Sequence, residues 1–579
     1  MAATAHVSHP DSFHHDDSMT VEAPSGGLIH RMSAEHSGRF ERKLWKVRDG
    51  VWCLVGNGLS NQTFVEGSEG LIAIDTGECN EEMRYALDAV AAQTDTPVVA
   101  VIYTHFHYVG GTQAVVEHVG SEVPIWSHAG VVGNRLRASS EVGPVSRSGL
   151  IHQFGMNLPA DGPDALVNVG LGLAFRNAEH APFTEGFIEP TTTFDTPTTA
   201  TIAGLRVEFT PAPSDSDDSV TIWFPDLSVC VNNLAWPVLF NVFPIRGEEY
   251  RDPRGLIAGL DHVAALGAEH LVGAHGPPLS GADEVELQVT RSRDAIQFMW
   301  DQTVRGINKG LTLGELTQQV QLPALYAESY FQTQFYGVVE HHVRQIHAGL
   351  RGWFDGDEAA LFPVPPAERA AKMIAGFGGA PTVRAQVAAA LADDDIRWAI
   401  DMASWLIAAP DPDPRTAHAD RVSLAGALRT IARRTTAANV RNWCLVRARH
   451  LDGTADTDRF HAHRFTVEQV LTAPLGDTLA TLRVMLDPAK CGDADRHLTV
   501  RVSSNGADEQ AGLHVRRGVA VPTSGRPDGP SLTLPKPTWA DLIAGKQTLP
   551  EALASPATST ADRQAVQEFL SWFEHRSLS

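Results

Sequence analysis

The sequence is short of long apolar runs and of cysteine. No stretch approaches the roughly 20 consecutive apolar residues that a membrane-spanning helix needs. The histidine- and aspartate-rich N-terminus lacks the basic flank and apolar core of a secretory signal. The 5 cysteines lie far apart, form no Cys-x-x-Cys pair and are odd in number, which argues against a cysteine metal site and a disulfide framework. We therefore expect a cytoplasmic protein with buried or partly buried thiols and no membrane partner.

Basic residues are also scarce. The chain has 46 Lys and Arg against 69 Asp and Glu, which gives a formal net charge of -23. This charge disfavours nucleic acid and anionic membranes as partners, so an anionic substrate would need a local cationic pocket. The remaining composition is ordinary for a globular protein, and the length of 579 residues predicts three or four domains.

One stretch concentrates the chemistry, Val101-Ile-Tyr-Thr-His-Phe-His-Tyr-Val-Gly-Gly111. The apolar, β-branched residues 98–103 predict a strand buried on both faces, which ends in two histidines one residue apart. In a loop after a strand, His105 and His107 can turn towards one point, and the two glycines allow a sharp turn into a helix near Thr112. Two converging neutral imidazoles indicate a metal ion. The plain alternative is a polar loop whose histidines bond to backbone carbonyls.

The residues before this stretch predict a layered α/β domain. Residues 44–55 alternate like two hairpin strands, and residues 63–75 predict two more strands, the last ending in Asp75. An amphipathic helix is expected over residues 81–92. A hairpin layer that runs into alternating strand and helix is typical of layered α/β domains.

Two further loops follow predicted strands. Residues 205–211 predict a strand that runs into an acidic loop, where Asp215 or Asp217 would supply an oxygen ligand. A short strand at residues 270–274 leads to His275, which a glycine and two prolines hold stiffly. Such a histidine suits a metal ligand or a catalytic base. A solvated surface turn is the alternative for either loop.

A series of motifs occurs in a specific order along the chain. These are Asn61 with Thr63-Phe-Val-Glu-Gly, Ile74-Asp75-Thr76, Thr104-His-x-His, Thr210-Pro, Ile245-Arg-Gly, His275-Gly-Pro, Tyr336-Gly337 and Gly352-Trp-Phe-Asp-Gly356. In this order they resemble the metallo-β-lactamase-fold alkyl sulfatases. The resemblance covers nearly all of the chain from Lys43 onwards.

The resemblance implies three domains after a flexible tail. It implies a metallo-β-lactamase αββα sandwich, an α-helical dimerisation domain and an α+β sterol-carrier-like domain. We expect the tail at residues 1–38, the catalytic domain at 39–285, the dimerisation region at 286–434 and the C-terminal domain at 435–579. The protein would then be a homodimer. An apolar tunnel in the C-terminal domain would imply a small-molecule substrate with an aliphatic portion, whereas a filled core is the alternative.

The metal motif departs from the family pattern Thr-His-x-His-x-Asp-His-x-Gly-Gly. Two residues are missing after His107, and with them the aspartate and histidine that serve the family's second metal. The neutral amide of Asn233 stands at or beside the family's bridging glutamate, and Asp215 aligns best with its metal-binding glutamate. Carried over residue by residue, the family's ligands are His105, His107 and Asp215 for the first metal and His275 alone for the second.

This ligand set predicts one tightly bound divalent ion in an open site. Two imidazoles and a carboxylate suit Zn²⁺ first, with Fe²⁺ or Mn²⁺ as alternatives. We expect His275, Tyr108 and Asn233 to act as catalytic groups around the ion, with Tyr108 filling the vacated space. Whether Tyr108 or Asp217 replaces a ligand stays open.

The resemblance implies hydrolysis of a sulfate ester by a metal-activated water. Arg246 and Arg251 lie in the region that resembles the family's sulfate-binding arginines, although either would also serve in a salt bridge. A site of two histidines and one carboxylate equally suits an iron-dependent oxidase or lyase. A binding protein with a decayed active site is the third alternative.

Overall fold

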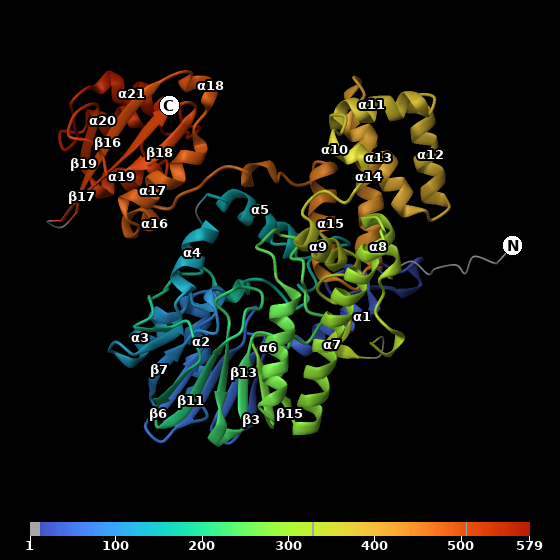
Figure 1. The fold of residues 1–579 in the computed structure, drawn as a ribbon, viewed down its shortest axis with the longest axis vertical. Helices are drawn as coiled ribbons and strands as arrows, with labels where there is room; N and C mark the ends of the chain where they lie inside the picture. Colours follow the sequence, from blue (N-terminus) through green and yellow to red (C-terminus); the bar gives the residue numbers. More distant parts are fainter. Residues whose placement is uncertain (1–11, 140, 327–328, 505–506, 579) are drawn as a thin grey trace. The chain divides into compact units, whose positions relative to one another are not determined.

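Two β-sheets lie face to face in the first part of the chain (Figure 1). This computed structural model describes residues 12–139, 141–326, 329–504 and 507–578. The strands of each sheet follow one another in sequence order. The first sheet contains β3 (Lys43–Arg48), β4 (Val51–Val55), β5 (Gln62–Gly67), β6 (Gly70–Ile74), β7 (Val98–Ile102), β8 (Ile125–His128) and β9 (Thr192–Phe194). The second contains β10 (Thr198–Ile202), β11 (Leu205–Pro211), β12 (Val220–Phe224), β13 (Val229–Asn232), β14 (His270–Gly273) and β15 (Leu279–Ser280).

One apolar cluster fills the space between the two sheets. Val65 and Ile74 of the first sheet and Phe209 and Ile222 of the second belong to it, and each is at most 1% exposed. Because successive side chains of a strand point to opposite faces, the alternate residues of these strands face outwards. The outward faces therefore need their own apolar cover.

Helices provide that cover on both sides (Figure 1). The covering helices are α2 (Asn80–Ala91) and α3 (Thr112–Val119) on the first sheet, and α6 (Pro253–Ala265) and α7 (Ala282–Asn308) on the second. The amphipathic α2 buries Met83 and Leu87 in a cluster with strand residues of the first sheet. Leu256 and Leu260 of α6 join a cluster with strand and α7 residues on the other side. The four layers confirm the predicted αββα sandwich.

The loops that carry the predicted site leave the sheets at strand ends. The strands β6 and β7 are parallel neighbours, as are β13 and β14. Because the carboxyl ends of parallel strands meet at one edge of a sheet, the loops of each pair start side by side. The predicted site residues His105, Asn233 and His275 follow three of these strands, and Asp75 follows the fourth.

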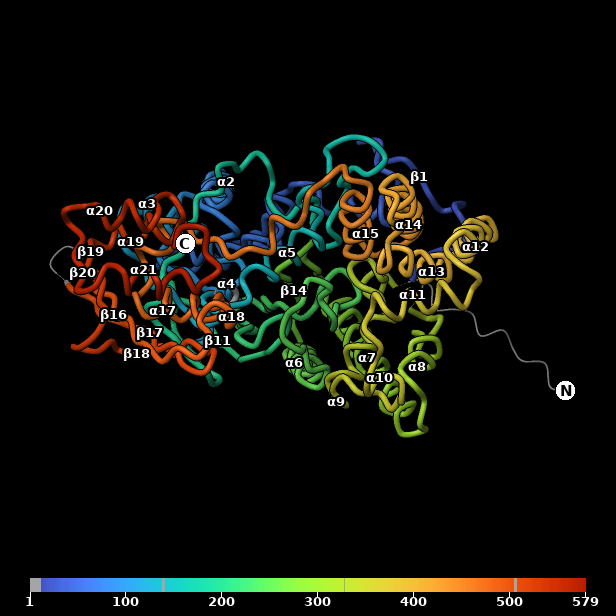
Figure 2. The backbone as a smooth tube through the Cα atoms, turned by 90° about the horizontal axis from the view of Figure 1, so that it is seen from above, coloured from blue at the N-terminus to red at the C-terminus, as the bar shows by residue number. Residues whose placement is uncertain are grey.

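A helical region follows the sandwich. Its helices are α8 (Leu313–Gln319), α9 (Val339–Arg351), α10 (Glu358–Leu361), α11 (Pro366–Gly376), α12 (Ala380–Ala392), α13 (Ile396–Ala408), α14 (Pro414–Arg434) and α15 (Ala438–Leu451). The helices α12 to α15 share one apolar cluster, and α14 lies beside α15 (Figure 2). The expected boundary at 434/435 therefore falls inside this bundle, and the compact unit continues to Thr457. The boundary was drawn from the family resemblance, whereas the helical packing continues across it.

The expected flexible tail through residue 38 is wrong for residues 12–38. This segment forms β1 (Thr20–Glu22), β2 (Leu28–His30) and α1 (Arg31–Ser37). Asp17 forms ion pairs of 2.9 and 2.7 Å with Arg433 and Arg434 at the end of α14, and Ile29 is 1% exposed. Few apolar residues suffice to order the segment because its polar groups bind a distant helix. The rest of the predicted tail, residues 1–11, lies outside the described residues.

The second compact unit consists of Leu136–Arg147 and Asp458–Ser579. Its five-stranded sheet has the order β18-β17-β16-β19-β20, and its apolar face packs with the helices into one cluster around Trp539 and Phe569. Phe465-Thr-Val has the apolar and β-branched residues of a strand, yet it leads into a helix that Thr466 caps. Residues 513–521, which alternate like a strand, form a hairpin that turns between Arg516 and Val519.

The elements of this unit have the following bounds, and α4 and α5 extend beyond the two ends of its first segment. They are α4 (Val131–Ser139), α5 (Gly143–Gln153), α16 (Val467–Thr472), α17 (Leu475–Leu482), α18 (Pro488–Cys491), β16 (Asp495–Ser504), β17 (Ala507–Arg516), β18 (Val519–Thr523), β19 (Ser531–Pro535), α19 (Lys536–Ile543), α20 (Leu549–Ala554), β20 (Ser559–Thr560) and α21 (Arg563–Ser571). Trp539 and Phe569 are each 1% exposed, so both helices that carry them dock on the sheet.

Two expectations drawn from the absences in the sequence meet the structure here. All 5 cysteines are buried thiols, as expected. Among the described residues, every helix is too short or too polar to cross a membrane.

Close packing at the turn before α3 makes a stability prediction. A Cβ added at Gly111 would overlap the carbonyl oxygen of Thr76 and approach Met83 Cβ at 2.6 Å. We expect Gly111→Ala to lower the free energy of unfolding by about 3 kcal/mol, as measured in a urea titration. Gly255→Ala is the matched control, because a Cβ at this helical position meets no atom within 4 Å. Equal stability of both variants would contradict the packing described here.

Candidate metal centre

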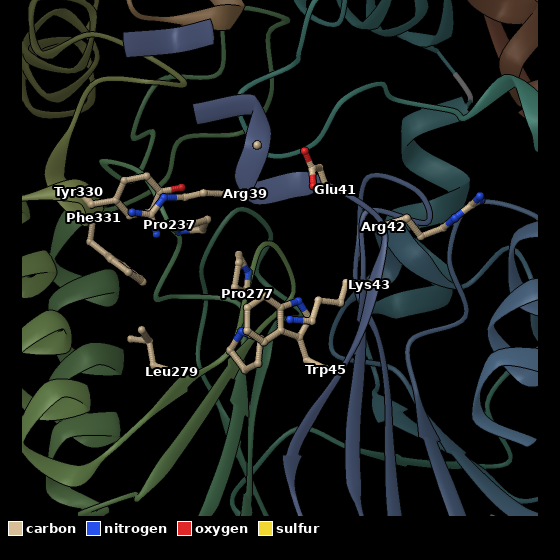
Figure 3. Close-up of a pocket in the computed structure, with 12 residues that line it drawn as sticks. Arg39, Glu41, Arg42, Lys43, Trp45, Pro237, Pro277, Leu279, Tyr330 and Phe331 are labelled. Carbon is tan, nitrogen blue, oxygen red and sulfur yellow. The ribbon is translucent and has the colours of Figure 1, made fainter. Parts of the chain in front are cut away.

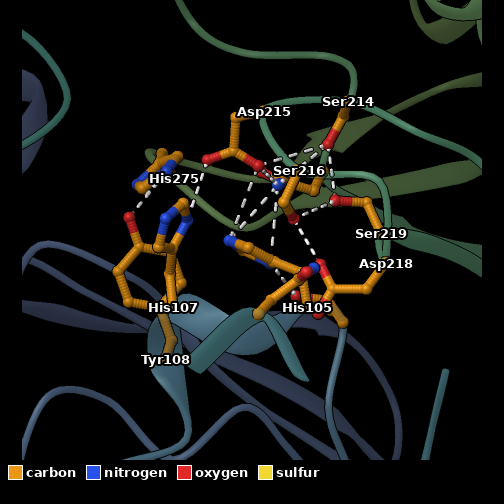
Figure 4. A network of polar contacts seen from close by, with 12 residues as sticks. His105, His107, Tyr108, Ser214, Asp215, Ser216, Asp218, Ser219 and His275 are labelled. Atoms are coloured by element: carbon orange, nitrogen blue, oxygen red, sulfur yellow. Dashed lines mark hydrogen bonds and ion pairs between the residues drawn. The ribbon is translucent and has the colours of Figure 1, made fainter. Parts of the chain in front are cut away.

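Three predicted ligands converge on one point (Figure 4). His105 and His107 follow β7, whereas Asp215 lies on the loop between β11 and β12. The distance is 3.7 Å from His105 Nε2 to Asp215 Oδ1 and 3.1 Å from His107 Nδ1 to Asp215 Oδ2. One donor atom from each residue lies within 4.8 Å of the others. Loops of two different sheets therefore bring these side chains together.

A chain of hydrogen bonds sets the tautomer of His105. Asp75 accepts from the Thr104 amide at 2.8 Å and from the Thr104 hydroxyl at 2.7 Å. Because the hydroxyl hydrogen is engaged with Asp75, the hydroxyl oxygen accepts from His105 Nδ1–H at 2.8 Å. His105 Nε2 is then left with its lone pair towards Asp215, which is the form that binds a metal. Burial lowers the pKa of His105 to about 3, which keeps the ring neutral.

Asp75, the acceptor at the start of this chain of hydrogen bonds, has an unusual backbone conformation. Its φ of 58° lies in the left-handed region that non-glycine residues rarely adopt. The side chain is buried, and burial raises its pKa to about 7 although the two hydrogen bonds from Thr104 oppose the rise. The residue therefore combines backbone strain with a buried carboxyl group, as residues beside functional sites often do.

Asn233 and Ser214 fix the carboxylate of Asp215. The Asn233 amide donates to Asp215 Oδ1 at 2.6 Å, while its own oxygen accepts from Trp236 Nε1 at 3.0 Å. The Ser214 hydroxyl donates to the same carboxylate oxygen at 3.3 Å. Burial opposes the charged form, yet His107 and its hydrogen bond hold the pKa of Asp215 well below its ordinary value. The predicted Asn233 thus lies in the site as a neutral donor.

His275 and Tyr108 form a separate pair at the edge of the site. His275 Nδ1 donates to the Leu59 carbonyl at 3.0 Å, so its Nε2 accepts from the Tyr108 hydroxyl at 3.3 Å. Burial lowers the pKa of His275 to about 4 and raises that of Tyr108 well above its ordinary value. Both groups are therefore neutral at physiological pH. His275 is not a member of the three-residue group of metal-binding donors.

The structure distinguishes the two candidate aspartates of the acidic loop. Asp215 contacts both imidazoles, whereas Asp217 accepts a hydrogen bond from Asn134 at 2.7 Å. The order of residues along the loop could not separate them, because a one-residue shift in a turn changes the direction of every side chain.

Glu248 is a site residue that the sequence analysis missed. Its carboxylate accepts from Arg246 Nε at 2.7 Å and from Arg251 Nη2 at 2.6 Å, and it lies 3.7 Å from His107 Nε2. Burial would lower the pKa of His107, but Asp215 and Glu248 together raise it to about 9. The signal for Glu248 was its position between two arginines in the segment Arg246-Gly-Glu-Glu-Tyr-Arg251.

A cavity of about 600 Å³ lies in another part of the sandwich unit (Figure 3). Arg39, Lys43, Trp45, Pro277 and Tyr330 are among its lining residues, which include none of the predicted site residues. Its cations are already engaged, because Arg39 stacks on the Tyr330 ring at 3.3 Å and Lys43 on the Trp45 ring at 3.9 Å. We therefore assign the chemistry to the histidine and aspartate group and not to this cavity.

The fold and the site are those of the metallo-β-lactamase superfamily. Residues 55–231 match the metallo-β-lactamase superfamily, and residues 312–454 match the alkyl sulfatase dimerisation family. Over 509 residues the chain is 36% identical to a linear primary-alkylsulfatase of Pseudomonas sp., an alignment that covers 84% of this chain and 93% of that protein. The chain therefore belongs to the alkyl sulfatase family of the metallo-β-lactamase superfamily, as the sequence motifs predicted.

One further relative agrees with this assignment, and a solved structure agrees with the fold. An (R)-specific secondary-alkylsulfatase of Pseudomonas sp. is 27% identical over 561 residues, covering 93% of this chain and 81% of that protein. The solved structure of a stereoselective inverting sec-alkylsulfatase of Pseudomonas sp. superposes with a TM-score of 0.80 at 24% identity, covering 97% of this chain and 92% of that chain. The second comparison bears on the fold alone.

The superfamily binds divalent metal ions, and the residues present fit such an ion. Two imidazole nitrogens and one carboxylate oxygen are donors that borderline divalent metals prefer. The hydrogen bond at His105 Nδ1 leaves the other ring nitrogen of that histidine as an acceptor, which the Asn233 amide approaches at 3.4 Å. The donor set is thus suited in its chemistry to a divalent ion.

The Asp75–Thr104–His105 chain makes a second prediction. Thr104→Val keeps the side-chain shape but removes the hydroxyl, so Asp75 loses a donor and His105 Nδ1 loses its acceptor. We expect a loss of about 1–3 kcal/mol in the free energy of unfolding of the metal-free protein, measured in urea. Thr104→Ser, which retains the hydroxyl, should lie closer to the wild type. A valine variant as stable as the wild type would refute the role of this chain.

Proposed function

We propose that this protein hydrolyses the sulfate ester of an aliphatic substrate. The observation that carries the proposal is the convergence of His105, His107 and Asp215 on one point in a member of the alkyl sulfatase family. A divalent ion at this point would supply an activated water at neutral pH. The buried surroundings strengthen the electrostatic interactions of the site, since little bulk water screens them.

The chain's own residues would bind the substrate and manage its protons. Arg246 and Arg251 hold two guanidinium groups near His107 and supply the local cationic pocket that the overall charge requires. Asn233 keeps the Asp215 carboxylate in place. The Tyr108 hydroxyl stays protonated at neutral pH and donates a hydrogen bond to His275 Nε2. This pair would form a fixed donor and acceptor beside the reacting group.

We propose one tightly bound ion per chain, with zinc first and iron or manganese as alternatives. A second ion would find the neutral amide of Asn233 and a histidine, His275, whose ring nitrogens already bond to Leu59 and Tyr108. One histidine alone does not hold a divalent ion tightly. Two histidines and one carboxylate are also the ligands of iron-dependent enzymes, so an iron-dependent oxidase or lyase is the second candidate function.

We further propose a cytoplasmic homodimer. The support for the dimer is the match of residues 312–454 to the alkyl sulfatase dimerisation family. The sterol-carrier-like character of the C-terminal domain, and a role for it in contact with an aliphatic tail, remain proposals from the family resemblance. We retain residues 39–285 as the catalytic domain.

Metal analysis tests the ligand set. Elemental analysis of natively purified wild type should give one divalent ion per chain. Asp215→Ala should lose it because the only carboxylate of the group is removed, whereas Asp217→Ala, the matched control on the same loop, should retain it. Asn233→Glu alone should not add a second ion. Two ions per wild-type chain would refute the single-metal proposal.

Substrate turnover tests the reaction. The metal-loaded protein should release inorganic sulfate and an alcohol from a linear alkyl sulfate. Arg246→Leu should lower kcat/KM about 100-fold, because a preorganised cation facing the sulfate is lost. Arg254→Leu, an exposed arginine on α6, is the control and should leave kcat/KM unchanged. Oxygen consumption by the iron-loaded protein without sulfate release would favour the second candidate.

A further inference from the structure

The two arginines of the site already hold an anion that belongs to the chain. Glu248 accepts from Arg246 through both Nε, at 2.7 Å, and Nη2, and from Arg251 Nη2 at 2.6 Å. These are charge-assisted hydrogen bonds from guanidinium groups to a carboxylate, the geometry that these groups also offer to a sulfate. One N–H group cannot serve the carboxylate and a substrate oxygen fully at the same time.

The Arg251 side chain and the Arg246 backbone are held by contacts other than those with Glu248. Arg251 Nη1 donates to the side-chain oxygen of Asn241 at 2.7 Å and to its carbonyl at 2.9 Å. The backbone amide of Arg246 donates to Gln153 at 3.2 Å. Removing the carboxylate would therefore free guanidinium N–H groups without releasing the Arg251 side chain or the backbone that carries Arg246.

The position of Glu248 allows its carboxylate to turn away from the two arginines. It lies in the irregular segment between β13 and α6, directly after Gly247, whose φ of 80° only glycine adopts without strain. Its side chain is 23% exposed, whereas those of Arg246 and Arg251 are 8% and 2% exposed. A rotation of the carboxylate towards solvent would therefore leave the two buried cations facing the site.

A buried donor beside this carboxylate also lacks an acceptor. Arg251 Nε is buried and has no hydrogen-bond partner among the residues that the structure describes. Buried donors are almost always paired, so this one indicates that a further acceptor belongs near Arg251. The three free oxygens of a sulfate ester offer more acceptor positions than the two oxygens of a carboxylate.

We propose that the Glu248 carboxylate is an internal anion that occupies the binding position of the substrate's sulfate group. It must be displaced before an alkyl sulfate binds. The proposal rests on the proposed sulfatase function. Glu248 is then a determinant of affinity and specificity. It raises KM, and it excludes weakly bound anions that cannot compete with a carboxylate already in place. The alternative is a structural role, in which Glu248 positions both arginines and His107. That role predicts the opposite result.

The test is sulfate binding by Glu248→Gln and Glu248→Ala. Affinity for inorganic sulfate is measured by isothermal titration calorimetry on the metal-loaded full chain, and KM is measured with octyl sulfate. Both variants should bind sulfate at least about ten-fold more tightly than the wild type, because one charge-assisted competitor is gone. KM should fall by a similar factor. Glu249→Gln makes the same charge change at the next, exposed residue and should leave both values unchanged.

Each other outcome has a definite meaning. Unchanged or weaker sulfate binding in both variants, with an unchanged Tm, would overturn the proposal in favour of the structural role of Glu248. Failure of both variants to fold would also overturn it, because the carboxylate would then be structural. Sulfate binding does not require turnover. Tighter binding without hydrolysis by any form would support the proposal and reject the sulfatase function, while hydrolysis with unaltered KM and sulfate affinity would do the reverse.

Discussion

A carboxylate buried between two imidazole rings is the constraint on which the site depends. Asp215 is buried, and its charge is favourable there because His107, whose pKa it raises, and a donating amide lie against it. No single element could assemble this group, since the histidines follow a strand of one sheet and the aspartate a loop of the other. The packed apolar layer between the sheets therefore sets the distance between the ligands, and the chemistry depends on the core.

Local patterns predicted much of the fold. The apolar run before His105 became the central strand β7, the amphipathic residues after Cys79 became α2, and the glycines after Tyr108 led into α3 as expected. The errors had two sources. The capping box of Thr466 and Gln469 starts a helix where apolar and β-branched residues are typical of a strand. The packing of α15 against α14 continues across the expected domain boundary.

The convergence of the site residues was predictable in part, and their hydrogen bonds were not. Loop positions after strands pointed to His105, His107 and His275, but a turn gives no fixed direction to Asp215 as opposed to Asp217. The hydrogen bond between Tyr108 and His275 joins two loops that are far apart in the sequence. Glu248 contacts cations on both sides of it in the sequence, yet its contact with His107 arises only when two loops meet.

The ordered N-terminal segment has a consequence for biosynthesis. Ser12 accepts from the Thr435 hydroxyl at 2.7 Å, Asp17 binds Arg433 and Arg434, and Thr20 donates to the Arg433 carbonyl at 3.2 Å. These contacts join positions more than 400 residues apart. During translation residues 12–20 must wait, without their final partners, until residues 433–435 have been made. Assembly of the first unit can therefore be completed only after α14 has emerged.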